Sequence, residues 1–191
     1  SNDTPTSSPK GPLSRQDYGL SGASPLANAL PNPTTTAPAT RSEQAPAGTD
    51  FGYFGGGHPG PVSTVDRVDY SNDTATASTR GPLSVARRAF TGAGNVPFGY
   101  FCGGFYLYLV STIDRIDYSN DTPTLAARAS LSSAKGGAKA AGNETCTWIG
   151  GGLDTPISTV DRFEYSNDTG TTPTKGPLSL AKSYHAAAGN L

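Results

Sequence analysis

Tyr70-Ser71-Asn72-Asp73-Thr74 is a five-residue sequence that the chain repeats unchanged. It returns at residues 118–122 and 165–169, and the chain opens on Ser-Asn-Asp-Thr at residues 1–4. The three full copies begin 48 and then 47 residues apart. A fixed period of this length is typical of a blade or solenoid unit that buries its apolar face only by stacking on a neighbour. The sequence therefore predicts a tandem repeat scaffold.

The repeat has three parts around this sequence. An aromatic and glycine-rich segment occupies residues 51–57, 98–104 and 148–152. A segment of the type Ser-Thr-Val-Asp-Arg-Val-Asp-Tyr occupies residues 63–70, 111–118 and 158–165. A segment that begins near Gly-Pro-Leu-Ser and ends on Gly-Asn occupies residues 81–95, 129–143 and 176–190.

These parts favour short strands joined by turns. Aromatic and β-branched residues mixed with Asp and Arg indicate strands with one solvated face. Asn72-Asp73 predicts a turn, because both side chains hydrogen-bond to their own backbone. The Ala-rich stretch from Leu83 to Ala93 is also compatible with a short helix, but Gly92 and Gly94 favour a strand. We therefore predict an all-β fold.

The composition narrows the classes of function. The chain has 191 residues, of which 35% are hydrophobic, 24 are glycine and 16 are proline, and this suits strands and turns better than long helices. The net charge is −1 and no basic stripe is visible, so we expect no nucleic-acid partner. No apolar run approaches the roughly 20 residues of a membrane span.

The repeats suggest five segments. We expect a partial repeat, the C-terminal half of a blade, at 1–23, and a Pro/Thr/Ala-rich linker or degenerate strand at 24–50. Three full repeats of 47–48 residues then occupy 51–97, 98–145 and 146–191.

The template resembles the kelch repeat, the blade of one β-propeller family. The glycine pairs of the kelch pattern are matched at residues 56–57, 103–104 and 151–152. Its Tyr-Asp position is held by residues 68–69, 116–117 and 163–164, and its arginine position by Arg87, Lys135 and Lys182. The tryptophan expected after the polar turn is absent, and Ala75, Pro123 and Gly170 stand there instead.

Copies this alike also resemble tandem kelch-like arrays in predicted structural proteins of aquatic bacteriophages and large algal viruses. That resemblance implies a surface appendage rather than an enzyme. About three and a half units are fewer than most propellers use, since these close with four to eight blades. We expect either an incomplete ring, a ring completed by the two termini, or part of a longer array.

Asn-x-Ser/Thr patterns could accept N-linked glycan in a secreted chain. They occur at Asn2, Asn72, Asn120, Asn143 and Asn167. The structural alternative is that Asn-Asp-Thr is simply a good turn.

The Asp-x-x-Asp pairs, at 66/69 and 114/117 with Asp161/Glu164 as the third copy, offer oxygen ligands to calcium. An arginine lies inside each pair, so ion pairs to Arg67, Arg115 and Arg162, within or between blades, are the favoured interpretation. Cys102 and Cys146 are offset by four template positions, which favours buried free thiols over a disulfide. We predict no metal site, no cofactor and no catalytic residues.

The loops after the glycine pairs differ most between copies, and this points to contact with a ligand. Tyr106, Tyr108 and His58 are the candidate ligand-binding residues in these loops. We expect a non-enzymatic structural or adhesive protein on an extracellular or virion surface, such as a virion fibre that contacts host glycan or protein. The alternative is a self-assembling, glycosylated extracellular filament subunit. Self-association is expected in both cases.

Overall fold

The computed structural model describes residues 21–23, 51–72, 74–153 and 156–189. Within these ranges the chain is all-β, with thirteen strands in three sheets and a single 3₁₀ turn, η3, at Tyr70–Asn72. The predicted fold class is confirmed. The strands are short because glycines, prolines and Asn-Asp turns interrupt the sequence every few residues.

The first and third sheets contain four strands each, and the second contains five, of which four follow the order of the sequence. The first sheet has β1 (Ser21–Ala23), β2 (Phe51–Gly55), β3 (Val65–Asp69) and β4 (Ser78–Arg80). The second has β5 (Thr91–Gly94), β6 (Phe98–Cys102), β7 (Thr112–Asp117) and β8 (Ala126–Ser130). The third has β9 (Lys139–Gly142), β10 (Cys146–Gly150), β11 (Val160–Glu164) and β13 (Thr174–Lys175). Neighbours within these sets are antiparallel, while β12 (Gly170–Thr171) crosses from the third copy to pair in parallel with β8.

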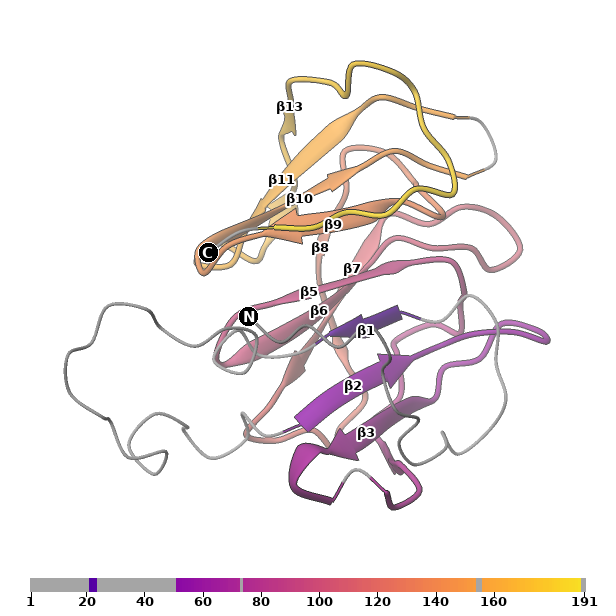
Figure 1. Ribbon diagram of the computed structural model, residues 1–191, viewed down its shortest axis with the longest axis vertical. Coiled ribbons are helices and arrows are strands. Elements are labelled where there is room, and N and C mark those ends of the chain that lie inside the picture. Colours follow the sequence, from indigo (N-terminus) through magenta and orange to yellow (C-terminus); the bar gives the residue numbers. More distant parts are fainter. Residues whose placement is uncertain (1–20, 24–50, 73, 154–155, 190–191) are drawn as a thin grey trace, which may run out of the picture.

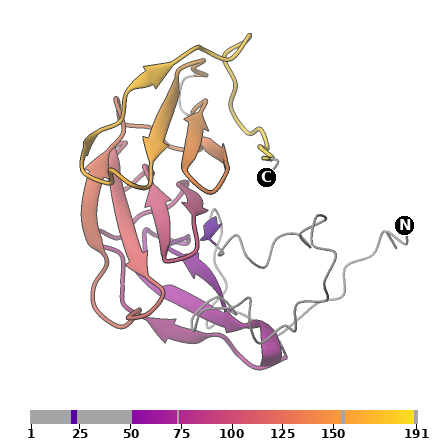
Figure 2. The ribbon, with the colours of Figure 1, turned by 90° about the vertical axis from the view of Figure 1, so that its left-hand side faces the viewer.

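The sheets stack along the long axis of the molecule, with the first at one end and the third at the other (Figure 1). The edge-on view in Figure 2 shows the same succession of β2 and β3, then the second sheet, then β10 and β11. The described sheets do not close into a ring. They form the arc expected of an incomplete propeller.

The innermost strand of each sheet is supplied by the end of the preceding copy. Thr91–Gly94 pairs with β6 through a hairpin in which Gly94 lies opposite Gly99, and β9 pairs with β10 in the same way. The Ala-rich stretch is therefore a loop followed by a strand in the first two copies, as the glycines predicted. Residues 186–189 of the third copy form no strand. Because the first two full copies end inside the next sheet, neighbouring sheets are interlocked by the chain itself.

Aromatic side chains fill the two junctions between sheets. The Tyr53 ring stacks on Tyr118 of the second sheet at 5.2 Å between centroids, and Tyr100 stacks on Tyr165 of the third at 5.4 Å. The first junction also buries Val65, Leu83, Phe90, Phe101, Ile116 and Leu125. The second also buries Cys102, Ile113, Leu131, Ala138, Ile149 and Phe163. Burial of each such side chain contributes roughly 1.5 to 3 kcal/mol, so stacking supplies the core that one thin sheet lacks.

Candidate functional site

A loop leaves each sheet after its glycine pair, and the loops of the first two sheets emerge at the same edge of the stack (Figure 1). The second glycine of each pair donates its N–H to the carbonyl oxygen of the basic residue at the kelch arginine position: Gly57 to Arg87 at 3.1 Å, Gly104 to Lys135 at 2.7 Å and Gly152 to Lys182 at 3.0 Å. These bonds fix where each loop begins.

Glycine is required at this turn. Gly103 has a φ of +69°, a left-handed conformation that other residues adopt at a cost. A Cβ placed there would lie 2.5 Å from the Lys135 carbonyl oxygen. The glycine pair is therefore explained by close backbone approach.

The loop at residues 105–109, here called the aromatic tip, protrudes from the second sheet. Phe105 and Arg88 exchange two backbone hydrogen bonds of 2.8 and 2.9 Å, and the Arg88 guanidinium lies 5.1 Å from the centre of the Phe105 ring. The Tyr106 N–H donates to the Tyr108 carbonyl at 3.1 Å, which closes a tight turn. Leu107 and Tyr108 are 74% and 68% exposed. The loop therefore presents large apolar side chains to solvent, while the hydrogen bonds at its base hold it in place.

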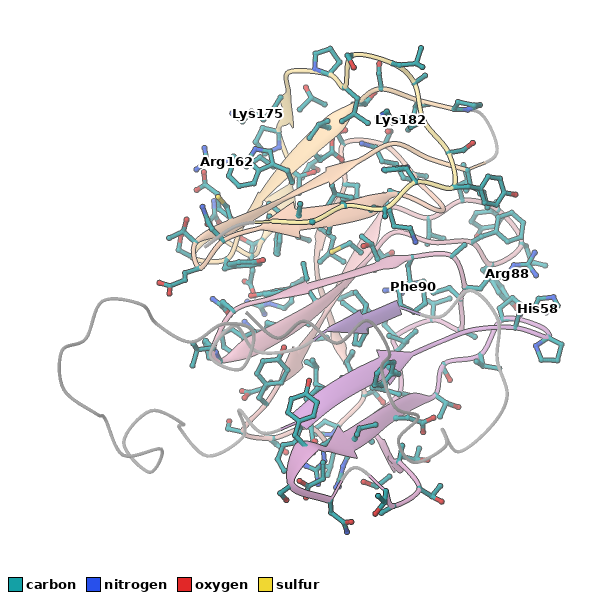
Figure 3. The ribbon with its side chains drawn as sticks, in the orientation of Figure 1. His58, Arg88, Phe90, Arg162, Lys175 and Lys182 are labelled. Atoms are coloured by element: carbon teal, nitrogen blue, oxygen red, sulfur yellow. The ribbon has the colours of Figure 1, made fainter. Side chains whose placement is uncertain are left out.

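His58 lies on the corresponding loop of the first sheet. Val62 of that loop forms a bridge with Arg87, and the next residue, Arg88, forms a bridge with Phe105. The two loops thus flank one short segment, and Figure 3 shows His58 and Arg88 at the same edge of the molecule. The structure brings Tyr106 and Tyr108 into one turn and places half-buried His58 on a neighbouring loop of that edge.

The predicted glycan acceptors lie in turns. Asn72, Asn120 and Asn167 are exposed, and the Oδ1 atom of each accepts a hydrogen bond from the threonine two residues later. Asn143 is half-buried, and its Oδ1 accepts bonds from the Thr145 and Cys146 backbone N–H groups at 3.0 and 3.1 Å. Asn2 lies outside the described residues. The side-chain hydrogen bonds fit the predicted turn role at the three described Asn-Asp-Thr sites, and glycosylation stays a prediction.

The aspartate of the repeated Asn-Asp-Thr sequence forms ion pairs between sheets. Asp121 pairs with Arg67 at 2.9 Å and Arg80 at 3.5 Å, both of the first sheet. It also accepts a bond from the Tyr53 hydroxyl at 3.0 Å. Burial raises the pKa of Tyr53 well above its ordinary value, and Asp121 adds to this, so the phenol keeps its proton.

The next junction repeats the arrangement. Asp168 pairs with Arg115 at 2.6 Å and with Arg128 at 3.1 Å. Arg67 and Arg115 thus form ion pairs between blades, one of the two predicted arrangements, but their partner is the aspartate of the Asn-Asp-Thr sequence and not an acid of the Asp-x-x-Asp pairs. Arg162 has no described sheet beyond it and pairs with Glu164 at 3.0 Å.

A second pair at each junction is fully buried. The Arg87 Nη1 atom lies 3.0 Å from Asp114 Oδ2, and the Lys135 Nζ atom lies 3.2 Å from Asp161 Oδ2, with all four side chains inaccessible to solvent. Ser84 completes the first site, with its hydroxyl 2.6 Å from Asp114 Oδ1. These contacts were not predicted from the sequence. Their signal was the constant offset between the basic and acidic positions, 27 and 26 residues in the two junctions.

Acid is expected to weaken the second junction through Asp168. Burial raises the pKa of Asp168, but hydrogen bonds from Arg128 and Arg115 outweigh it, so the pKa lies below its ordinary value of 3.8. The folded carboxyl thus holds its proton less tightly than the unfolded one. The stabilisation is complete above about pH 4 and is lost as the pH falls through the folded pKa.

Thermal unfolding of the wild type and Asp168→Asn between about pH 7 and about pH 2 would measure this effect. The melting temperature of the variant should start lower and fall less steeply with acid. Parallel curves for the two proteins would contradict the assignment.

The remaining reactive groups are buried or isolated. Cys102 and Cys146 are free, buried thiols, as the template offset predicted, and burial raises the pKa of Cys102 to about 12. Among the described residues no three His, Cys, Asp or Glu side chains gather closely enough to hold a metal ion. In the same part of the chain, no helix has the length and apolar character needed to cross a bilayer.

No protein-family model matches the chain, and no curated protein is significantly similar to it.

Proposed function

We propose that this chain is a non-enzymatic, kelch-like structural repeat protein that presents adhesive loops on an extracellular or virion surface, as a fibre or appendage does. The observation that carries the proposal is the aromatic tip. Large apolar side chains are expensive to expose in isolation, and clustered exposure is typical of contact surfaces. Here they stand on a turn that is hydrogen-bonded at both ends.

Host surface glycan or protein is the proposed ligand. Tyrosine offers a flat apolar face with a polar hydroxyl and loses little conformational entropy on binding, which suits both sugars and protein surfaces. Tyr106 and Tyr108 supply such faces, and the cation of Arg88 lies at the base of the same loop. His58 extends the surface towards the first sheet.

Replacing both tyrosines tests the proposal. On a glycan array and on host cells, Tyr106→Ala/Tyr108→Ala should bind at least about tenfold more weakly than the wild type, because truncation of an aromatic anchor commonly costs more than 1 kcal/mol. The melting temperature should change little, since both residues lie at the surface, Tyr106 38% and Tyr108 68% exposed.

Tyr184→Ala is the matched control, because Tyr184 is 84% exposed and lies outside the aromatic tip. Binding of this control should equal that of the wild type. Equal binding by the double variant as well would remove the aromatic tip from the proposal.

The second candidate is a self-assembling, glycosylated extracellular filament subunit. Trp148 on the third sheet favours it, because this large aromatic side chain is 37% exposed. Negative-stain imaging with a glycan stain separates the two candidates, since bare sugar-positive fibres support the filament and particles with virion bodies support the appendage.

A further inference from the structure

Arg88 differs from the other arginines that the structure describes. There are seven of them, and the other six form ion pairs with acids: Arg67, Arg80, Arg87, Arg115, Arg128 and Arg162. Arg88 forms no ion pair with a described acid, and its guanidinium donates no hydrogen bond to a described residue. Because an arginine side chain carries five N–H donors, this cation keeps its capacity to bind an anion.

The aromatic tip and the neighbouring backbone hold Arg88 in place. Its two backbone hydrogen bonds with Phe105 fix the main chain, and the Ala89 carbonyl oxygen accepts the Gly137 N–H at 2.5 Å. The guanidinium lies 5.1 Å from the centre of the Phe105 ring. A guanidinium is weakly hydrated and is attracted to an aromatic face, so its planar set of donors stays oriented there. Figure 3 shows Arg88 at the loop edge of the molecule.

The accessible acids lie at the other end of the strands. Asp69, Asp117 and Glu164 pair with the first residues of β2, β6 and β10, whereas the glycine pairs follow the last residues of these strands. Glu144 lies in the hairpin between β9 and β10, at that same end. The remaining described acids are buried: Asp66, Asp114, Asp121, Asp161 and Asp168. Among the described residues, the edge with the aromatic tip therefore presents a cation and no accessible carboxylate.

We infer that the aromatic tip binds a sugar that carries a carboxylate, with the sugar ring stacked on a tyrosine of the tip and the carboxylate paired with Arg88. This inference rests on the proposed adhesive function and names the ligand class of the same site. The planar fork of a guanidinium matches the two oxygens of a carboxylate through two parallel hydrogen bonds. Tyr106 and Tyr108 supply the flat apolar faces on which the sugar ring lies.

The number of cations favours a sugar with a single carboxylate over a densely sulfated chain. Residues 86–90 and 105–109 hold one accessible cation, Arg88, because Arg87 is buried in its ion pair with Asp114. Sulfated polymers are bound by runs or clusters of Lys and Arg, which these two segments lack. One oriented guanidinium beside exposed aromatic rings instead matches one anionic group on one sugar ring.

A glycan array that displays each acidic glycan beside its neutral parent tests the inference. Suitable pairs are sialyllactose with lactose, and a glucuronate-terminated glycan with its methyl ester. The wild type should bind the acidic member at least about tenfold more tightly, as one charge-assisted pair of hydrogen bonds allows. Arg88→Gln should bind both members equally, at the level of the neutral parent. Arg88→Lys should bind the acidic member more weakly than the wild type, because an ammonium does not form the paired bonds.

Lys175→Gln is the matched control for the charge. It removes one exposed cation from β13 of the third sheet, which Figure 3 shows far from Arg88. The net charge of the protein changes as in Arg88→Gln, so a general electrostatic attraction would fall equally in both variants. We expect Lys175→Gln to keep the preference of the wild type for the acidic glycans. Melting temperatures confirm that each variant is folded.

The inference is overturned if the wild type binds both members of each pair equally, if folded Arg88→Gln keeps the preference, or if sulfated glycans bind more tightly than carboxylated ones. Binding to neutral glycans or to deglycosylated host cells that is lost in Tyr106→Ala/Tyr108→Ala would overturn this ligand class alone and leave the adhesive function standing. If the double tyrosine variant binds carboxylated glycans as the wild type does, the aromatic tip is not the site and both proposals are wrong.

Discussion

Asp114→Ala is expected to lower the free energy of unfolding by about 3 to 5 kcal/mol, because it leaves a buried guanidinium without its counter-ion. The Arg87 side chain is inaccessible to solvent and would retain one strong acceptor, the Phe101 carbonyl oxygen at 3.0 Å. The Ser84 backbone N–H and hydroxyl, which donate to Asp114 at 2.9 and 2.6 Å, would also lose their acceptor. The loss falls on the junction between the first two sheets.

Urea or thermal unfolding measures the effect, and a domain of this size should lose roughly 2 to 4 °C in melting temperature per kcal/mol. Lys182→Ala is the matched control, since it removes the exposed copy of the same repeat position and should change stability by about 0.5 kcal/mol or less. A loss below about 1 kcal/mol for Asp114→Ala would show that the buried pair adds little to the junction.

The double variant Arg87→Met/Asp114→Leu separates two effects. One is the loss of the attraction between Arg87 and Asp114, and the other is the cost of leaving a buried charge unpaired. Replacing a buried ion pair with apolar groups of similar volume is often neutral or stabilising. We expect the double variant to be more stable than Asp114→Ala. If it is as unstable, the site depends on its hydrogen bonds and shape, and the unpaired charge is not the main cost.

Much of the fold was predictable because its signals are local. Glycine pairs, Asn-Asp turns and short β-branched segments recur at a fixed period, and each acts on the few residues around it. The strands β2, β6 and β10 begin within three residues of the aromatic segments that predicted them. The boundaries of the sequence repeats do not coincide with the boundaries of the sheets, and no local signal shows this. Thr91–Gly94 belongs to the first full repeat but pairs with β6 of the next one.

The ion pairs were harder to predict because they join residues of different copies. Arg67 and Asp121 are 54 residues apart and meet only when two sheets stack. From the sequence, the acids of the Asp-x-x-Asp pair around Arg67, Asp66 and Asp69, were the expected partners. Trp148 shows the same limit of local signals. Its segment has the sequence pattern of a buried strand, but the exposure of its side chain depends on whether another sheet packs over it.

Gly81→Ala is expected to cost about 3 kcal/mol or more, the upper range for forcing extra volume into a packed site. The obstacle is the Pro123 carbonyl oxygen, which belongs to the backbone of the next sheet and cannot turn aside as a side chain would. Separating the two backbones would also strain two bonds of the junction, from Gly81 N–H to Asp121 O at 2.9 Å and from Leu125 N–H to Pro82 O at 2.8 Å.

Gly176→Ala is the internal control, because it makes the same change at the same repeat position where no further sheet is described. Its stability should equal the wild type or exceed it by about 0.4 to 1 kcal/mol, since alanine restricts the unfolded chain. The difference between the free energies of unfolding of Gly81→Ala and Gly176→Ala therefore measures the cost at the contact between sheets, separately from any cost within the turn. Equal losses in both would mean that the turn needs glycine for its own backbone, and that the junction is looser than the Gly81–Pro123 approach implies.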